Sequence, residues 1–211
     1  IKKNGWNEAY HQRTQPGDLV NLSIVIATAE NTGGISATFT YKTHSIVGEL
    51  GRNVVDLRHS IQNDRILQCF ATKASDFETA LTHTRWASVG SITEENCHPI
   101  NNYTTIQSKP AYPHYCNIKA QINVVLNGDI DNYQALRQSL ETGSELIDPQ
   151  VTTDTKIIPM QIEKYLKDGQ DLVESFRLAV NDFEGSHAIA MTCNLAPGKM
   201  FLALNGSGQS I

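Results

Sequence analysis

The sequence is poor in charge, in cysteine and in long apolar runs. Only 18% of its 211 residues are charged, against roughly 25% in an average soluble domain, so much of the polar surface must be Asn, Gln, Ser and Thr. The four cysteines, Cys69, Cys97, Cys116 and Cys193, occur singly with no Cys-x-x-Cys pair. This argues against a disulfide framework or a zinc site and favours reduced thiols in the cytoplasm. No apolar run approaches the roughly 20 residues of a membrane helix, so no membrane partner is predicted.

Basic residues are also in the minority, 17 against 22 acidic ones, for a formal charge of −5. This balance argues against a nucleic acid or an anionic membrane surface as the main partner. Apolar residues make up 40% of the chain, enough for a sizeable core in one large domain or at most two small ones. The chain starts at Ile1 with neither Met nor a signal peptide, and we expect it to be a segment of a longer protein.

Hydrophobic periodicity predicts an α+β domain with a mostly antiparallel sheet. The first twenty residues are polar and predict no regular structure. Beyond them, alternation and apolar runs predict strands at Leu22–Thr28, Ile35–Lys42, Ile118–Leu126, His187–Cys193 and Met200–Leu204, the last two forming a hairpin. A period near 3.6 predicts helices from Asn53, as N-cap, to about Ile66, and over Asn132–Leu140, Asp154–Leu166 and Leu172–Phe183. The densest stretch, Leu81–Tyr103, predicts neither a clean helix nor a clean strand.

Within that stretch, residues 83–90 read His-Thr-Arg-Trp-Ala-Ser-Val-Gly. Arg85 places a planar fork of donors beside the flat ring of Trp86, and an arginine grips a carboxylate with two parallel hydrogen bonds. Taken alone, the pair also fits a surface stack or an interior anchor.

Two further segments combine with this one. The predicted strand that ends in Asn127-Gly128 offers an amide side chain and an unhindered backbone N–H, the donors of an oxyanion hole, although Asn-Gly is also the usual hairpin turn. Asp154 lies between two threonines before a predicted helix, where it could hold an ammonium group or cap the helix. An Arg for a carboxylate, an Asp for an ammonium and an oxyanion hole for an amide together describe a pocket for L-glutamine.

The order of these motifs, with Asn96-Cys97-His98-Pro99 between the first and the second, resembles the class II glutamine amidotransferases. The resemblance covers roughly Ile46 to Ile211 and is strongest to the glutaminase domains of members that convert fructose 6-phosphate to glucosamine 6-phosphate. It implies an N-terminal-nucleophile hydrolase fold, a four-layer αββα sandwich of antiparallel sheets, with residues 1–211 as a domain incomplete at both ends. The implied partners are L-glutamine and a sugar-phosphate isomerase domain on the same parent chain, and a homodimer is compatible with it.

The resemblance also implies a role for each site residue. No cofactor is implied, and the spacing of the seven histidines predicts no metal site; His83 and His98 are predicted to be hydrogen-bonded scaffold residues. Arg85, helped by Ser88, would bind the α-carboxylate of glutamine, Asp154 the α-amino group, Asn127 and Gly128 the developing oxyanion, and Trp86 would close over the ligand.

The chain departs from the family pattern at several positions. Val89 replaces a histidine, Leu126 replaces a histidine before Asn-Gly, and Lys156 replaces an acidic residue. The family nucleophile is an N-terminal cysteine followed by glycine, and no cysteine here precedes a glycine. We therefore expect a truncated glutaminase domain that is inactive alone. A degenerate domain that senses an amino acid without turnover is the alternative, and a module with no ligand is a third.

Overall fold

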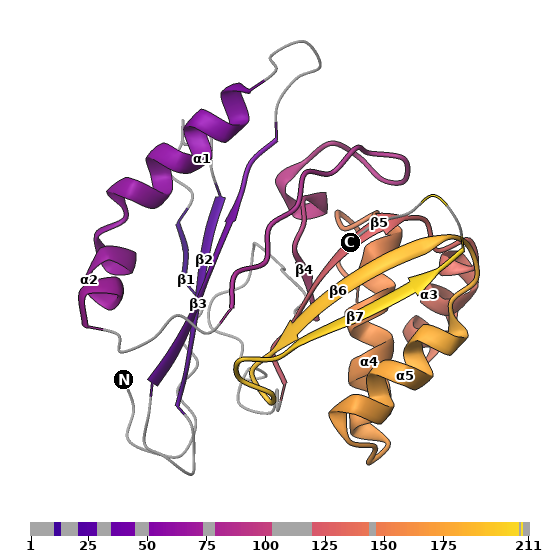
Figure 1. Ribbon diagram of the computed structural model, residues 1–211. Coiled ribbons are helices and arrows are strands. Elements are labelled where there is room, and N and C mark those ends of the chain that lie inside the picture. The colour runs from indigo at the N-terminus through magenta and orange to yellow at the C-terminus, as the bar shows by residue number, and fades with distance from the viewer. Residues whose placement is uncertain are drawn as a thin grey trace. The chain divides into compact units, whose positions relative to one another are not determined.

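The computed structural model describes residues 11–13, 21–28, 35–44, 51–73, 79–102, 120–143, 147–206 and 208. The chain folds into two compact units. The first contains residues 1–77 and 110–118, and the second contains residues 78–109 and 119–211. Each unit has a sheet of its own (Figure 1).

The first unit contains a three-stranded antiparallel sheet and two helices. The strands, in the order β1-β2-β3, are His11–Arg13, Asn21–Thr28 and Ile35–Lys42. The two long strands confirm the strands predicted from the sequence. They pair from Asn21 opposite Lys42 to Thr28 opposite Ile35. Strand β1 was not predicted, because the polar residues around it carry no alternating apolar pattern.

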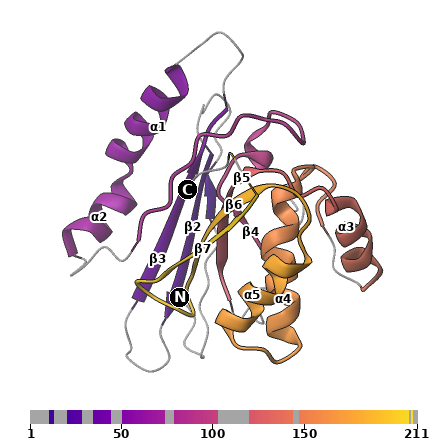
Figure 2. The same cartoon turned by 45° about the vertical axis from the view of Figure 1, so that its right-hand side comes forward.

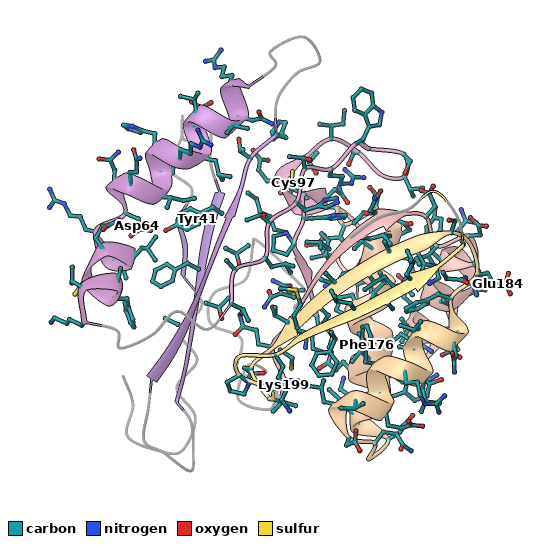
Figure 3. All side chains as sticks on the ribbon, viewed as in Figure 1. Tyr41, Asp64, Cys97, Phe176, Glu184 and Lys199 are labelled. Carbon is teal, nitrogen blue, oxygen red and sulfur yellow. The ribbon has the colours of Figure 1, made fainter. Side chains whose placement is uncertain are left out.

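The helix predicted over residues 53–66 is wrong in its start and in its continuity. Helix α1 spans Arg52–Asn63 after Gly51, which has a φ of 86° and takes the N-cap position expected for Asn53. The helix ends before Asp64, and α2 continues over Arg65–Lys73. Asp64 causes the break, because its Oδ1 accepts hydrogen bonds from two amides in the first turn of α2, at 2.8 and 3.1 Å. Its Oδ2 accepts the hydroxyl of Tyr41 at 2.9 Å (Figure 3).

The second unit contains a four-stranded antiparallel sheet and three α-helices. In the order β4-β5-β6-β7, the strands are Ile100–Asn101, Ile122–Gly128, His187–Cys193 and Met200–Asn205. Helices α3 (Tyr133–Thr142), α4 (Ile157–Lys167) and α5 (Leu172–Asp182) cover one face of this sheet (Figures 1 and 2). Among the described residues, two short 3₁₀ turns, η1 (Glu94–Asn96) and η3 (Asp154–Lys156), lie in the connections.

The apolar core of this unit lies between the sheet and the helices. Alternate residues of β5, such as Val124 and Leu126, face the helices together with Ile189 opposite Leu126 on β6. Phe176 of α5 packs into the same core (Figure 3). This core packs β5 against α4. The candidate site lies around the end of β5 and the start of α4.

The α+β class with antiparallel sheets is confirmed. The predicted helices over residues 132–140, 154–166 and 172–183 and the β6-β7 hairpin appear within a few residues of their expected bounds. The strand predicted from residue 118 begins at Ile122 in the described part of the chain, and residues 118 and 119 lie outside it. Four-layer stacking and a single domain over residues 1–211 stay predictions. No helix among the described residues is long and apolar enough to cross a membrane.

Candidate active site

Residues 79–102 contain little regular structure, as the sequence predicts, and are held in place by Asn96. This side chain is fully buried. Its amide nitrogen donates to Ser91 Oγ at 2.9 Å and to the carbonyl of Gln150 at 3.1 Å. Its oxygen accepts the backbone N–H groups of Thr152 at 2.8 Å and Thr153 at 2.9 Å. One amide therefore joins the segment that carries Arg85 to the segment that carries Asp154.

Gly90 lets the same two segments approach closely. Its φ is 90°, and a Cβ atom at this position would lie 2.9 Å from the backbone nitrogen of Thr153. A larger residue would be strained in conformation and would push the two backbones apart. Next to Gly90, the backbone N–H of Ser91 donates to Thr152 Oγ1 at 3.1 Å.

Asp154 is buried, and backbone donors bind both of its oxygens. Oδ1 accepts the N–H of Thr155 at 2.8 Å, and Oδ2 accepts the N–H of Ile130 at 2.9 Å. Burial nevertheless raises the pKa of Asp154 above its ordinary value, and the nearby charge of Asp129 adds to the rise, while the two amides and the hydroxyl of Thr153 oppose it. The carboxylate is thus fixed in orientation and would be stabilised by a cation.

Arg85 is half-buried and lies within electrostatic range of Asp154. Burial lowers the pKa of Arg85, and the nearby Cys97 and Asp154 side chains act in the opposite direction. Its guanidinium donates to the carbonyls of Val89 and Ser91, so the loop folds back around its own arginine. A guanidinium carries five donors, enough to bind a carboxylate in addition to these carbonyls.

Asn127 and Gly128 end strand β5 and do not form the two-residue hairpin turn that was the alternative. Gly128 pairs with His187 of β6 and has a φ of 116°. A Cβ atom there would collide with the carbonyl of Ser186, so only glycine fits. Two residues further on, Ile130 donates to Asp154. This end of β5 and the Asp154 carboxylate therefore lie together.

Ser88 and Trp86 occupy the exposed part of the loop. Ser88 Oγ donates to Asp129 Oδ1 at 2.6 Å, which ties the loop to the residue after Gly128. Trp86 is 93% exposed, so its ring lies in solvent. Asp129 was not among the predicted site residues, although a carboxylate directly after Asn-Gly was visible in the sequence.

The three residues that depart from the family pattern each have defined surroundings in the structure. The carbonyl of Val89 accepts a hydrogen bond from Arg85, and Leu126 lies in the apolar core. Lys156 is 2% exposed, and its Nζ donates to the carbonyl of Asn101 on β4 at 2.6 Å. Lys156 thus joins η3 to the sheet.

His83 and His98 are hydrogen-bonded to one another and to the site, as expected of scaffold residues. Their Nδ1 atoms lie 2.9 Å apart, and His98 Nε2 lies 2.9 Å from Thr155 Oγ1. Burial lowers the pKa of His83, and the charge of Arg85 lowers it further. Within the described ranges, no group of three or more His, Cys, Asp or Glu side chains could hold a metal ion.

The structure thus brings together Arg85, Ser88, Asp154 and the end of β5 at Gly128, and it leaves Trp86 in solvent. The partners that hold these residues were harder to predict. The threonines beside Asp154 and the histidine after Cys97 were visible in the motifs, but their mutual contacts join residues up to 57 positions apart.

Comparison with known proteins finds curated relatives and no matching family model. The chain is 37% identical over 114 residues to the glutamine–fructose-6-phosphate aminotransferase (isomerizing) of Sulfurisphaera tokodaii, covering 54% of this chain and 16% of the relative. It is 32% identical over 120 residues to the enzyme of the same name from Methanothermobacter thermautotrophicus, covering 57% and 18%. The Clostridium tetani enzyme is 35% identical over 124 residues, covering 58% and 17%.

The chain therefore spans less than a fifth of the length of these relatives. Two solved structures are also similar. One is the glutamine phosphoribosylpyrophosphate amidotransferase of B. subtilis, at 18% identity and a TM-score of 0.42, over 58% of this chain and 22% of that one. The other is an allosteric regulatory enzyme of purine biosynthesis, at 20% identity and a TM-score of 0.44, over 60% and 23%. The resemblance predicted from the motifs is confirmed by the curated relatives.

Proposed function

We propose that this chain is the glutamine-binding part of a glutamine-dependent amidotransferase, in which L-glutamine yields glutamate and ammonia for transfer to fructose 6-phosphate. The observation that carries the proposal is that a half-buried guanidinium, Arg85, lies within electrostatic range of a buried carboxylate, Asp154, beside the strand end at Gly128. The names of the curated relatives support the reaction and its acceptor.

Each end of a glutamine molecule has a complementary group. The α-carboxylate would lie on Arg85, whose donors pair in parallel with two oxygens. The α-ammonium would lie on Asp154, where it would compensate the unfavourable burial of that carboxylate. The amide carbonyl would then face Asn127 and Gly128, whose N–H donors stabilise the negative charge that develops on the oxygen when the amide is attacked.

Two neighbours would adjust this pocket. The hydroxyl of Ser88 donates to Asp129, so its predicted contact with the α-carboxylate would require it to leave that partner. The exposed ring of Trp86 is available to close over a bound ligand, with a large apolar area to bury.

Hydrolysis requires a nucleophile besides these groups. In the family mechanism it is an N-terminal cysteine whose own amino group serves as the base, and none of the four cysteines here precedes a glycine. We propose that the chain alone binds glutamine without hydrolysing it. A parent protein would supply the nucleophile and a sugar-phosphate isomerase domain that uses the ammonia in the cytoplasm.

A domain that binds an amino acid without turnover is the second candidate. It is favoured by Leu126 and Lys156, which stand where the family has a histidine and an acidic residue and which contact the core and strand β4. Glutaminase activity of the full-length parent separates the two, because the enzyme releases glutamate from glutamine and the sensor releases none.

Isothermal titration of the 211-residue chain with L-glutamine tests the proposal. Arg85→Ala removes a charged, bidentate contact, so the Kd is expected to rise by roughly 30- to 150-fold, about 2–3 kcal/mol. Arg177→Ala is the matched control, because Arg177 is exposed on α5 and pairs with Glu174. A glutamine analogue without the α-amino group should bind weakly to the unaltered chain. Equal Kd values for the unaltered chain and Arg85→Ala would refute the role of Arg85.

A further inference from the structure

His98 contacts three segments that are distant in sequence and that each carry one part of the proposed glutamine site. Its Nδ1 lies 2.9 Å from Nδ1 of His83, two residues before Arg85. The same Nδ1 accepts the backbone N–H of Leu126, the residue before Asn127, at 3.5 Å. On the opposite side of the ring, Nε2 lies 2.9 Å from Thr155 Oγ1, beside Asp154.

Since each ring nitrogen could donate or accept, we assign the protons of the two imidazoles from these contacts. Because the N–H of Leu126 can only donate, His98 Nδ1 must accept, and a neutral His98 then carries its proton on Nε2. That proton is donated to Thr155 Oγ1, while His83 carries its own proton on Nδ1 and donates it to His98. The rings lie close, with centroids 4.6 Å apart.

Beyond Thr155, the network reaches Asp154 directly. Thr155 Oγ1 lies 3.5 Å from Asp154 Oδ1, and Thr153 Oγ1 lies 3.2 Å from Thr155 Oγ1 and 3.3 Å from Asp154 Oδ1. His98, Thr155 and Asp154 are all buried. In such an environment a fully satisfied hydrogen-bond network fixes the orientation of each member.

We propose that His98 is a positioning residue: one neutral imidazole holds the Arg85 segment, the end of β5 and the Asp154 turn in the arrangement that binds glutamine. The inference rests on the proposed function for its ligand and on the contacts above for its geometry. His98 joins the three segments through hydrogen bonds of one side chain.

The role makes binding sensitive to protonation of the histidine pair. An added proton would charge the pair beside the guanidinium of Arg85, and a proton on His98 Nδ1 would remove the acceptor used by Leu126. The charged or titratable groups on the segments that His98 joins are Arg85 on the loop, Cys97 next to His98, Asp129 after β5, and Asp154 and Lys156 on η3. Burial and Arg85 lower the pKa of His83, so this proton is taken up below a pH of about 6.5.

Matched variants of the complete 211-residue chain test the role by titration with L-glutamine. His98→Ala is expected to raise the Kd about tenfold, because it leaves buried donors and acceptors unpaired. His98→Gln can still donate to Thr155, and His98→Asn can still accept from Leu126, so each should recover part of the affinity. Thr155→Val keeps the shape of the side chain and should raise the Kd a few fold. His59→Ala, at an exposed position on α1, is the control and should leave it unchanged.

Two readouts separate positioning from a structural role. The Kd of the unaltered chain should rise as the pH falls below about 6.5, and this rise should be lost in a chain with both His83→Gln and His98→Gln. Nitrogen-15 spectra of the ligand-free chain should show His98 with its proton on Nε2 at neutral pH, whether or not glutamine binds.

The outcomes distinguish the inference from the proposed function. An unaltered chain with no affinity for glutamine would refute the proposed function and, with it, the ligand named here. A chain that binds glutamine while His98→Ala and Thr155→Val bind equally tightly would overturn the positioning role alone. A proton on His98 Nδ1 at neutral pH would overturn the assigned network.

Discussion

Two buried regions of the second unit differ in chemistry: one is apolar and the other is polar. The core between the sheet and helices α4 and α5 is apolar, with Ile122 and Ile189 fully buried. The polar cluster, defined as Asn96, His98, Thr153, Asp154 and Thr155, is almost as fully buried. The core is stabilised by loss of water from apolar surface, which needs no particular partner. The cluster is tolerated only because its polar atoms are paired, so its contacts are specific and its geometry is fixed.

The difference predicts that substitutions in the core lower stability, whereas substitutions in the cluster lower both stability and glutamine affinity. The three predictions below test this distinction in order of decreasing effect.

The largest effect is expected from Ile189→Ala on strand β6. The side chain is fully buried, so its truncation leaves a cavity and should lower the free energy of unfolding by about 2–5 kcal/mol. Urea denaturation measures this loss. The Kd for glutamine should stay unchanged in the folded protein, because the Ile189 side chain packs in the apolar core. Val173→Ala, at an exposed position on α5, is the control and should change stability little. A large rise in Kd for Ile189→Ala would contradict the expectation that core substitutions affect stability alone.

A smaller loss of stability is expected from Asn96→Ala in the polar cluster. This variant leaves the amides of Thr152 and Thr153 and the carbonyl of Gln150 without their partner, which should cost about 1–3 kcal/mol. Glutamine affinity should fall as well, because the Arg85 segment is released from the Asp154 segment.

Asn63→Ala provides the control for Asn96→Ala, since Asn63 is exposed and bonds only within its own helix region. If Asn96→Ala lowered stability but kept full glutamine affinity, the polar cluster would contribute to stability alone, as the apolar core does, and the predicted difference between the two regions would be wrong.

The smallest effect is the dependence of stability on pH. Burial lowers the pKa of His187 in the core, with Asp131 opposing, and burial also lowers the pKa of His83 beside the cluster. Between these lowered values and the ordinary 6.5, the unfolded chain binds more protons than the folded one. The free energy of unfolding should therefore fall as the pH falls through this window, by no more than about 1.4 kcal/mol per pH unit for each histidine.

The two histidines can be separated by variants. His187→Phe should remove the contribution of His187 to this pH dependence, and denaturation at several pH values measures the change. His83→Gln should remove the contribution of His83, beside the polar cluster, to this pH dependence. A free energy of unfolding that rises as the pH falls from 6.5 would contradict the predicted direction of this change.

The sequence predicts the core well because its signal is local. Alternation in residues 187–193 and the apolar stripe of residues 157–166 each reveal which face is buried. The break at Asp64 and the strand at residues 11–13 were missed, because a capping carboxylate and a short polar strand leave little trace in hydrophobic periodicity. The candidate site residues were predicted from motif order, yet their contacts were not, since Asn96 accepts hydrogen bonds from Thr152 and Thr153 across more than 50 residues. Such pairing depends on the finished fold.

A crystal structure of the chain with bound L-glutamine tests the central claim most directly. We predict the α-carboxylate on the guanidinium of Arg85, the α-ammonium on the carboxylate of Asp154 and the amide oxygen toward Asn127 and Gly128. Glutamine bound elsewhere, or with its α-carboxylate turned away from Arg85, would contradict the account.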